Sequence, residues 1–244
     1  MSKPLTGKVA LVTGASRGIG RAIAERLARD GAAVMVHYMS SEAAAREVAG
    51  KIVAAGGKAD IVQGDIADLD AVARILATTK DRLGRLDILV NNAAEGPRAN
   101  FDKVTVEHYD RLFAITRGTF FAMQGAARMM GEGGRIVSIT SAAVKSCMAD
   151  APVYAASKAA IQTFSKAFSR DLGERGITVN CVAPGVTDTD MVRGGPVALL
   201  DSARKGNAFK RLADTTDIAD IVAFVCSHDA RWLTGQVVGA DGGL

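Results

Sequence analysis

Three side chains in the middle of the chain have the types and spacing needed to exchange a proton with a carbonyl oxygen. Tyr154 and Lys158 are four residues apart in a segment of helical periodicity, so their side chains share one face. A phenol has a pKa near 10, about three units above neutral, and a neighbouring ammonium can lower it through its charge. Ser141 follows a predicted strand, and its hydroxyl can hydrogen-bond a substrate oxygen. The set predicts acid–base chemistry at a carbonyl or alcohol carbon, although a Tyr-x-x-x-Lys pair alone is usually structural.

A glycine-rich turn near the N-terminus predicts a binding site for a pyrophosphate. The segment Thr13–Gly20 reads TGASRGIG and lies between an apolar strand-like run and an alanine-rich helical segment. Glycines let the backbone turn sharply and approach a phosphate, which binds the N–H groups at the start of the helix. The spacing is GxxxGxG rather than the GxGxxG of most dinucleotide folds. Its place between the first strand and the first helix, more than the glycines themselves, favours a dinucleotide site.

The residues after the second predicted strand favour NADPH over NADH. In Rossmann proteins that select NAD, an Asp or Glu near this point binds the ribose 2′-hydroxyl. Tyr38 occupies that place here, so no carboxylate repels a 2′-phosphate. Arg17 and the hydroxyls of Ser40 and Ser41 could bind the phosphate, the arginine by charge-assisted hydrogen bonds. Alternatively, Ser40 or Ser41 is the N-cap of the next helix, and the two roles are compatible.

The elements that must position these residues alternate along the chain as short apolar strands and longer helical segments. This alternation indicates a parallel sheet covered on both faces, and right-handed crossovers then make it doubly wound. We therefore expect an α/β protein with a single Rossmann fold of about seven strands, and Ser141 in the crevice at the carboxyl ends of the strands. The predicted strands are 9–13, 33–37, 59–63, 88–90, 135–140, 178–183 and 237–239, and the predicted helices are 18–30, 41–55, 69–83, 105–130, 153–175 and 216–227.

We expect one domain over residues 1–244, because no linker, repeat or low-complexity segment divides the chain. The exception to regular structure is 187–207, with Gly194, Gly195 and Pro196 in its middle. A loop of that length in a compact domain is typically a lid or a mobile segment, so we expect it to border the substrate.

Composition and charge exclude several other classes of protein. The net charge is only +4 and no basic run of five or more occurs, which argues against a nucleic-acid partner. No apolar run approaches the roughly 20 residues that span a bilayer, and the N-terminus lacks a signal pattern, so we expect a cytoplasmic protein without a membrane partner. The spacing of Cys147, Cys181 and Cys226 predicts free thiols. The histidines His37, His108 and His228 are far apart, so we expect no metal site.

Together and in order, these motifs resemble the short-chain dehydrogenase/reductase family. The similarity extends from about residue 8 to residue 243, and within the family the chain looks most like the 3-oxoacyl-acyl-carrier-protein reductase group. The residues that carry the resemblance are TGASRGIG at 13–20, Asp65 after the third predicted strand, Asn91-Asn92-Ala93-Ala94, Ser141, Tyr154-Ala155-Ala156-Ser157-Lys158 and Pro184-Gly185.

The resemblance implies a role for each of these positions. Tyr154 would protonate the carbonyl oxygen, or act as the base in the reverse direction; Lys158 would bind the ribose hydroxyls and lower the tyrosine pKa; Ser141 would position the carbonyl. Asn91 is expected to stabilise the sheet. The implied cofactor contacts are Gly14, Ser16, Arg17, Gly18, Ile19 and Gly20 in the turn, Tyr38 and Ser40 after the second strand, Asp65 and Ile66 at the adenine, Asn92 and Ala93 along the cofactor, Tyr154 and Lys158, and Pro184, Gly185 and Thr187 near the carboxamide.

The chain departs from the family pattern in the segment between NNAA and the fifth strand. The family usually carries F-x-x-N-x-x-G there, and that Asn supports a water that links the lysine to solvent. This segment is one residue short, so that either Ile115 or Thr116 stands where the Asn belongs. Either the proton relay is rebuilt or proton delivery is impaired, and we expect activity to survive because Tyr154, Lys158 and Ser141 do the central chemistry.

The resulting prediction is an NADPH-dependent reductase of a small-molecule ketone, which could be a 3-oxoacyl thioester. The polar loop at 95–98 is interpreted as solvent-facing, and the acidic residue in 131–134 weakens the case for an acyl carrier protein. The alternatives are an NAD-dependent alcohol dehydrogenase and a dinucleotide-binding sensor or scaffold without turnover. The family resemblance also implies a homotetramer, for which the candidate contacts are Phe113, Phe120, Phe121, Phe164, Phe168, Trp232 and the segment 235–244.

Overall fold

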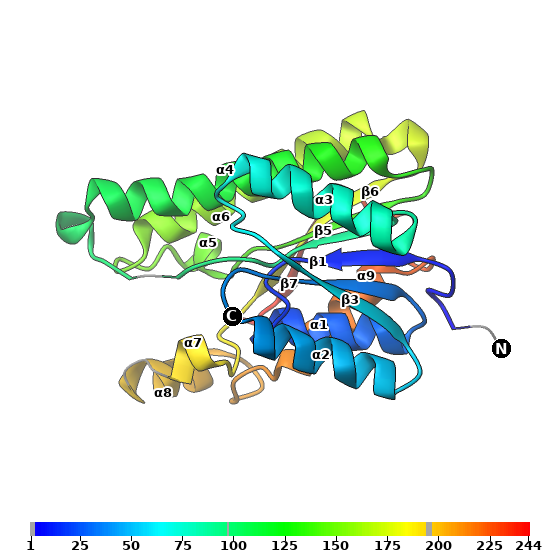
Figure 1. The fold of residues 1–244 in the computed structure, drawn as a ribbon. Helices are drawn as coiled ribbons and strands as arrows, with labels where there is room; N and C mark the ends of the chain where they lie inside the picture. Colours follow the sequence, from blue (N-terminus) through cyan, green and yellow to red (C-terminus); the bar gives the residue numbers. More distant parts are fainter. Residues whose placement is uncertain (1–2, 97, 194–196) are drawn as a thin grey trace.

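The computed structural model describes residues 3–96, 98–193 and 197–244, and it is built around a seven-stranded sheet (Figure 1). The strands lie in the order β3-β2-β1-β4-β5-β6-β7, and every neighbouring pair is parallel. Their order reverses at β1, which makes the switch point where ligands bind in open α/β sheets. The prediction of a doubly wound parallel sheet is thus confirmed. The strands are β1 (Val9–Val12), β2 (Ala33–Tyr38), β3 (Lys58–Gln63), β4 (Ile88–Asn91), β5 (Arg135–Ile139), β6 (Thr178–Pro184) and β7 (Val237–Ala240).

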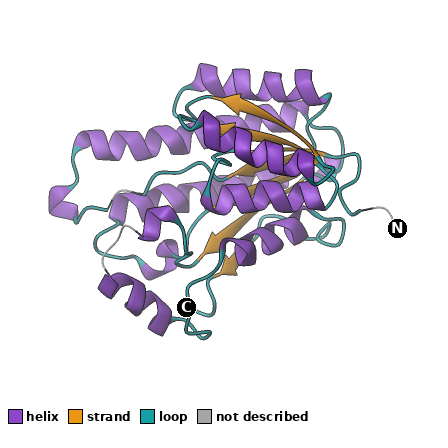
Figure 2. Ribbon diagram, turned by 60° about the horizontal axis from the view of Figure 1, so that its bottom comes forward, coloured by secondary structure: helices purple, strands orange, loops and turns teal. Residues whose placement is uncertain are grey.

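Helices cover both faces of this sheet (Figure 2). One face packs against α1 (Gly18–Arg29), α2 (Glu42–Ala54) and α9 (Thr215–Cys226). The other packs against α3 (Leu69–Leu83), α4 (Val106–Met129) and α6 (Pro152–Asp171). The short helices α5 (Ala143–Ser146), α7 (Asp190–Arg193) and α8 (Val197–Gly206) lie beyond the carboxyl ends of the strands, at the left of Figure 1.

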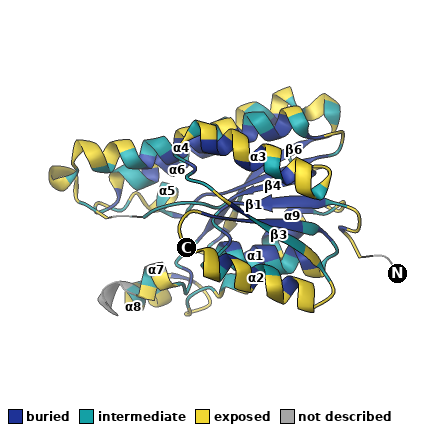
Figure 3. Ribbon diagram, in the orientation of Figure 1, coloured by how far each residue is buried: buried dark blue, intermediate teal, exposed yellow. Residues whose placement is uncertain are grey.

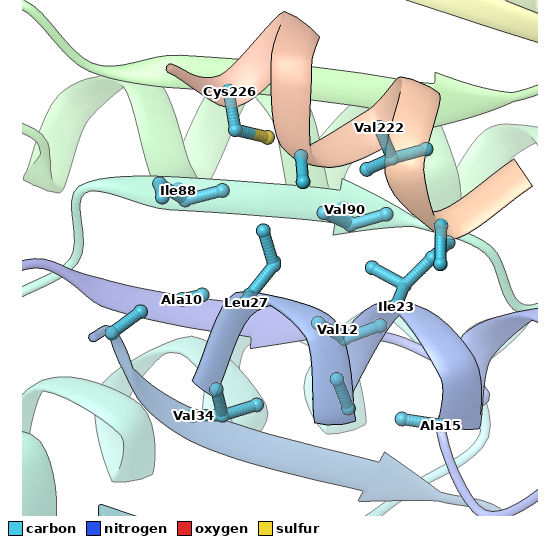
Figure 4. Close-up of a cluster of buried hydrophobic side chains, with 14 of the residues drawn as sticks. Ala10, Val12, Ala15, Ile23, Leu27, Val34, Ile88, Val90, Val222 and Cys226 are labelled. Atoms are coloured by element: carbon cyan, nitrogen blue, oxygen red, sulfur yellow. The ribbon is translucent and has the colours of Figure 1, made fainter. Parts of the chain in front are cut away.

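Each face of the sheet has its own apolar core, because successive strand residues point to opposite sides. In β1, Ala10 and Val12 join the core under α1 and α9, whereas Leu11 joins the core under α3 and α4. Figure 4 shows Ile23 and Leu27 of α1 lying over the strands, with residues of α9 beside them. The central strands are buried, whereas the edge strands β3 and β7 are mostly intermediate or exposed, and the outer faces of the helices are exposed, as Figure 3 shows. The continuous apolar runs in the sequence therefore reflect strands that are covered on both sides.

The segment 187–207 differs from the long irregular loop that the sequence suggested. The helices α7 and α8 lie in it, and residues 194–196 between them are outside the described ranges. The side chain of Asn207 ends α8, because its Nδ2 donates to the carbonyl oxygens of Ala203 at 2.8 Å and Arg211 at 2.7 Å. The Gly-Gly-Pro sequence at 194–196 suggested a loop, but a short helix lies on each side of it.

Two smaller differences from the prediction are the end of one helix and the presence of an additional short helix. The helix expected over 153–175 ends as α6 at Asp171, and a separate 3-10 turn follows at Gly173–Arg175. The short helix α5 lies between β5 and α6, where the sequence predicted no helix. Within the described ranges, no helix combines the length and the apolar character needed to cross a bilayer.

Candidate active site

The carboxyl ends of four adjacent strands bring most of the expected site residues to one edge of the sheet. β1, β4, β5 and β6 are neighbours in the sheet, and each runs directly into a residue named by the sequence. These residues are Gly14, Asn92, Ser141 and Gly185. The parallel order of the sheet therefore places segments more than 170 residues apart along the chain beside one another, since Gly14 and Gly185 follow strands of the same edge.

The turn after β1 is held in place by partly buried hydrogen bonds between neutral groups. The Thr13 hydroxyl accepts the backbone N–H groups of Asn92 at 2.9 Å and Ala93 at 3.0 Å. In return, the Asn92 side chain donates to the carbonyl oxygens of Thr13 and Gly14, both at 3.0 Å. Asn92 thus fixes the turn by using both of its amide protons, and β1 and β4 become one rigid support for the loop.

Glycine is required in this turn because there is no room for a side chain. A Cβ on Gly20 would lie 2.3 Å from the carbonyl oxygen of Gly14, and one on Gly14 would lie 2.9 Å from Cα of Ala93. Gly14 and Gly18 also have φ values of +62° and +56°, which glycine adopts readily. The result is a turn that exposes backbone atoms where a side chain would otherwise fill the space.

The helix that follows this turn leaves its first N–H groups available. α3 and α4 begin with Asp68 and Thr105, whose side chains accept a backbone N–H of the first turn. α1 instead begins after Arg17, which makes no capping hydrogen bond, and its first turn holds no acidic residue. Unpaired N–H groups and the positive end of the helix dipole bind anions. The glycine cradle and the uncapped helix therefore fit the pyrophosphate of a dinucleotide, with Ser16, Arg17, Gly18 and Ile19 around it.

The ends of β2 and β3 form the second part of the expected cofactor site. Tyr38 is the last residue of β2 and is 7% exposed, and Ser40 beyond it is exposed. Ser41 occupies the N-cap of α2, but its side chain makes no capping hydrogen bond. Among the residues that the structure describes, no carboxylate pairs with Arg17, so its guanidinium and the serine hydroxyls are available to a phosphate.

Asp65, which follows β3, is held in its ionised form by an arginine of α4. Its Oδ2 accepts from Nη1 of Arg111 at 2.8 Å, and its Oδ1 accepts from the N–H of Ala67 at 2.9 Å. Burial opposes ionisation, yet these bonds keep the pKa of Asp65 below its ordinary value. The backbone of the neighbouring Ile66 packs so closely on α4 that a Cβ on Gly118 would lie 1.6 Å from its carbonyl oxygen. Asp65 and Ile66 are therefore fixed from the α4 side.

Ser141, Tyr154 and Lys158 come together as the sequence suggested. Tyr154 and Lys158 lie in the first two turns of α6, and the Lys158 Nζ is 5.7 Å from the centroid of the Tyr154 ring. The Ser141 hydroxyl lies close enough to the phenol of Tyr154 to lower its pKa, and its Oγ accepts the N–H of Ala143 at 3.1 Å. The three groups can therefore act on one oxygen atom, with a hydroxyl, a phenol and an ammonium around it.

The proton affinities of Tyr154 and Lys158 are set mainly by burial. Burial raises the pKa of Tyr154, and the Ser141 hydrogen bond and the charge of Arg98 oppose that rise. Burial lowers the pKa of Lys158 to about 8, against the weak opposite effect of Cys181. The pKa of Tyr154 thus lies above its ordinary value and not below it as expected, because loss of solvent around the phenol outweighs the effects of Ser141 and of the Arg98 charge.

A small cavity of about 10 Å³ lies behind Lys158. Ile115 and Thr116 both line it, together with Glu95 and Ser157. The Thr116 hydroxyl donates to the carbonyl oxygen of Leu112 at 2.9 Å within α4. The departure from the family pattern therefore lies next to Lys158, whichever way the segment is aligned. The Lys158 Nζ itself donates to the carbonyl oxygen of Ile139 at 3.0 Å.

The loop at 95–98, interpreted from the sequence as solvent-facing, contributes charged groups to the site. Arg98 donates from Nη1 to Oδ2 of Asp150 at 2.7 Å, and the N–H of Ala99 donates to the carbonyl oxygen of Asp150 at 2.9 Å. Glu95 accepts from Nε of Arg111 at 2.9 Å. The loop after β4 is thereby tied to the loop before α6 and to α4. Arg98 and Asp150 form a charged rim at the Tyr154 side of the site.

The segment after β6 approaches the glycine-rich turn from the opposite side. Gly185 is pressed against Asp241, since a Cβ there would lie 3.0 Å from Cα of Asp241. The Thr187 hydroxyl donates to the carbonyl oxygen of Gly185 at 3.1 Å. The methyl group of Thr189 would be 3.4 Å from a Cβ on Gly18. Pro184 ends β6, so this strand leads directly into the segment that faces the cradle.

Asn91 donates to the Ser138 hydroxyl at 3.2 Å across β4 and β5, which agrees with its expected role in the sheet.

Several other residues around the site could not be identified from the sequence. Contacts made by Thr13, His37, Arg98, Arg111 and Thr189 were not expected, because each depends on residues far away in the sequence. Thr13 alone carried a local signal, as the residue that opens the glycine-rich turn.

Comparisons with known proteins agree with this geometry. A family model described as Enoyl-(Acyl carrier protein) reductase matches residues 14–244. An uncharacterized oxidoreductase of Methylorubrum extorquens is 42% identical, with all of both chains covered, and versicolorin reductase 1 of Aspergillus parasiticus is 41% identical over 98% of this chain and 97% of its own. The structure of the angucycline C-6 ketoreductase LanV with bound NADP has a TM-score of 0.95 at 43% identity and covers 100% of this chain and 97% of its own. A short chain dehydrogenase from Burkholderia cenocepacia in complex with NADP has a TM-score of 0.94 at 43% identity, with 98% of each chain covered.

Proposed function

The chain belongs to the short-chain dehydrogenase/reductase family, and from this premise we propose that it reduces a ketone with NADPH, using Tyr154 as the general acid. The observation that carries the proposal is the meeting of Ser141, Tyr154 and Lys158 beside an open glycine cradle. The family is one of oxidoreductases that act on alcohol and carbonyl groups, and relatives of this chain are named as reductases. The proposal adds that the reaction runs as a reduction, that Tyr154 is the general acid and that NADPH is the cofactor.

The side chains around Tyr154 fit the role of a general acid in the proposed reduction. The phenol is protonated at neutral pH, because its pKa lies above the ordinary value of 10, and it can donate its proton to the carbonyl oxygen. Ser141 would hydrogen-bond the same oxygen and hold the carbonyl in place. The ammonium of Lys158 would stabilise the phenolate that remains after proton transfer. Bound NADPH supplies the hydride for the carbonyl carbon.

The cofactor preference rests on the residues at the ends of β1 and β2. Gly14, Gly20 and the uncapped start of α1 would hold the pyrophosphate, and Asp65 and Ile66 would flank the adenine. Arg17 and Ser40 would bind the 2′-phosphate, where an NAD-selective site would have a carboxylate. Structures of relatives that contain NADP or NADPH support the same choice. Asn92, Ala93, Pro184, Gly185 and Thr187 would line the remainder of the cofactor site.

The substrate would be a ketone that enters between the charged rim and the α7–α8 segment. Relatives include reductases named for hydroxynaphthalene, versicolorin and angucycline substrates, which favours a ketone on a fused aromatic system. A 3-oxoacyl thioester is the alternative that the sequence suggested. A fused ring is wide and apolar, whereas a thioester carries a flexible chain, so the two substrates need openings of different shape. Comparing kcat/KM for the two therefore distinguishes them.

The test measures consumption of reduced nicotinamide with NADPH and NADH in parallel, against a panel that holds fused-ring ketones and a 3-oxoacyl thioester. We expect turnover with NADPH, and a loss of about 10²–10⁴-fold in kcat for Tyr154→Phe with a much smaller loss of NADPH affinity. Tyr109→Phe is the matched control, because Tyr109 is an exposed residue of α4 that stacks on Phe113. Faster oxidation of alcohols with NAD would favour the dehydrogenase alternative. Tight NADPH binding without turnover on any substrate would favour a sensor.

A homotetramer built on α4 and α6 is the assembly that we propose. Phe120 of α4 packs edge-on against Phe164 and Phe168 of α6 at centroid distances of 5.1 and 5.2 Å, and Phe121 beside it is 39% exposed. At the other end of the chain, Trp232 is 97% exposed near the segment 235–244. Burial of such apolar surfaces stabilises association. Light scattering coupled to size-exclusion chromatography should give four times the chain mass of 25.3 kDa, and a monomer would contradict the proposal.

A further inference from the structure

A buried histidine of β2 lies between the two parts of the proposed cofactor site. The His37 side chain is among the most deeply buried of the polar residues, at 1% exposed. Its Nδ1 accepts the backbone N–H of Gly14 at 3.0 Å, and its Nε2 lies 3.0 Å from the carbonyl oxygen of Gly64. Its own carbonyl oxygen accepts the N–H of Ala15 at 2.8 Å. One residue therefore contacts the glycine-rich turn twice and the end of β3 once.

These partners fix the protonation state of the ring. Nδ1 faces an N–H donor, so it must be unprotonated, whereas Nε2 faces a carbonyl oxygen and must carry the hydrogen. The ring is therefore neutral, with its hydrogen on Nε2. Burial is consistent with this state, because it lowers the pKa of His37 to about 4 against the opposing effects of the Gly64 hydrogen bond and of the Asp65 charge.

The contacts of His37 with Gly14 and Gly64 lie where a small movement of the backbone would shift groups that face the proposed ligand. Gly14 is held on both sides, since its N–H donates to His37 and its carbonyl oxygen accepts from Asn92. That same carbonyl oxygen is the atom nearest to where a Cβ on Gly20 would be. Gly64 immediately precedes Asp65, the residue expected at the adenine. A single imidazole thus sets the separation of the turn that faces the pyrophosphate from the end of β3.

We propose that His37 is a positioning residue for the dinucleotide, whose neutral Nε2–H ring holds the glycine-rich turn and the end of β3 at the spacing that the cofactor requires. This inference rests on the proposed function, since it needs the site to bind NADPH. His37 touches no ligand atom in this role. Its effect is transmitted through the N–H of Gly14, which would otherwise be a partly buried donor without this partner.

Three substitutions separate this role from that of a core side chain. In His37→Asn the amide oxygen stands close to the position of Nδ1 and can accept from Gly14. In His37→Gln the longer amide reaches the position of Nε2 and can bond Gly64, but not both partners. His37→Leu fills the space and bonds neither. The NADPH dissociation constant, measured by fluorescence titration of the folded protein, is read beside the melting temperature.

We expect NADPH affinity to fall by about tenfold in His37→Leu, and His37→Asn to recover most of that loss while His37→Gln recovers less. If His37 had only a structural role, the three variants would differ in melting temperature, but their NADPH affinities would not follow this order. Equal NADPH affinity in His37→Leu and the wild type would overturn the proposal. If the wild type itself fails to bind NADPH, the proposed function fails instead, and the two results are therefore distinct.

A second measurement on the unaltered protein covers the case in which the variants do not fold. Long-range proton–nitrogen NMR spectra report which ring nitrogen of a histidine carries hydrogen. We expect the His37 ring to show an unprotonated Nδ1 and a protonated Nε2 throughout pH 5.5–8, because its pKa of about 4 lies well below that range. A ring that is protonated on Nδ1, or that titrates near the ordinary pKa of about 6.5, would overturn the assignment.

Discussion

At the glycine-rich turn, the atoms that face the proposed ligand belong to the backbone, whereas around Tyr154 they belong to side chains that carry or exchange charge. The turn is held by Thr13, His37 and Asn92, whose neutral side chains form hydrogen bonds of ordinary length with backbone groups of the turn and of the segment after β4. The Tyr154 side is bordered instead by the ion pair of Arg98 and Asp150. These two regions meet at the carboxyl ends of neighbouring strands.

This difference suggests how each region can tolerate change. A backbone site depends on the absence of atoms, so that adding one carbon is enough to damage it. A site made of side chains depends on proton affinities and on partly exposed charges, which solvent screens. Substitutions in the turn should therefore act through sterics and be severe, and substitutions at the rim should act through charge and be mild.

The largest effect is expected when a methyl group is added in the turn. In Gly20→Ala the new Cβ would meet the carbonyl oxygen of Gly14 at 2.3 Å and Nδ2 of Asn92 at 2.4 Å. Since backbone atoms would have to move, we expect a loss of about 1–3 kcal/mol in the free energy of unfolding and a severe loss of NADPH binding. Urea denaturation and fluorescence titration measure the two quantities.

The matched control for this substitution is Gly50→Ala in the middle of α2. Apart from the backbone of α2 itself, a Cβ on Gly50 would meet no heavy atom within 4 Å, so the methyl group would mainly reduce the freedom of the unfolded chain. Its free energy of unfolding should rise by about 0.5–1 kcal/mol, without effect on NADPH. If Gly20→Ala bound NADPH as tightly as Gly50→Ala, the turn would not be the backbone site described above.

The second effect is a pH dependence specific to the Tyr154 side. Lys158 has a pKa of about 8 in the folded protein and 10.5 as its ordinary value, so the ammonium is lost above pH 8 only when the chain is folded. The kcat/KM for ketone reduction should fall above about pH 8, by roughly tenfold per pH unit if the charge is essential. Between pH 8 and 10.5 the unfolded state binds more protons, so Lys158 makes the free energy of unfolding rise over the same interval.

Activity and stability should therefore change in opposite directions across that interval. Lys158→Met removes the titrating group, and the part of the stability change due to Lys158 should vanish with it. A rate profile that stays flat to pH 10 would show that the ammonium is not needed, or that cofactor binding restores its ordinary pKa. Comparing kcat with kcat/KM separates these two causes, because they report the bound and the unbound enzyme respectively.

The smallest effect is expected at the charged rim. Arg98→Ala removes a partly exposed ion pair with Asp150, so the free energy of unfolding should fall by only about 0.2–1 kcal/mol. The charge of Arg98 opposes the effect of burial on Tyr154, and its removal should raise the pKa of the phenol further. We expect a change of a few-fold in KM for the ketone, with NADPH affinity unaffected.

Arg82→Ala serves as the matched substitution for the rim. Arg82 of α3 pairs with Asp60 of β3 at 3.4 Å and is also exposed, but no residue of the Tyr154 side touches that pair in the described contacts. Its stability loss should be similar and its KM unchanged. A shift in KM that is equal in both variants would mean that Arg98 acts only through general stability.

The sequence alone determined the order of the strands and of the long helices, and it singled out the glycine-rich turn and the candidate pair Tyr154 and Lys158. Apolar runs such as Val9–Val12 are continuous because a doubly covered strand has no solvent-facing side, and this pattern is local. The turn TGASRGIG and the pair Tyr154 and Lys158 are local as well, since each acts within one loop or one helix. Residues whose partners are a few positions away could thus be predicted.

Only the tertiary structure decided which groups support these residues and how strongly they hold protons. Gly14 and His37 are 23 positions apart, and Arg98 and Asp150 are 52 apart, so no spacing rule relates them. The helices α7 and α8 were concealed by the Gly-Gly-Pro at 194–196, where a local breaker signal outweighed helical periodicity. The pKa of Tyr154 lies above its ordinary value because burial, which depends on every element packed around a group, outweighs the effects of Ser141 and of the Arg98 charge.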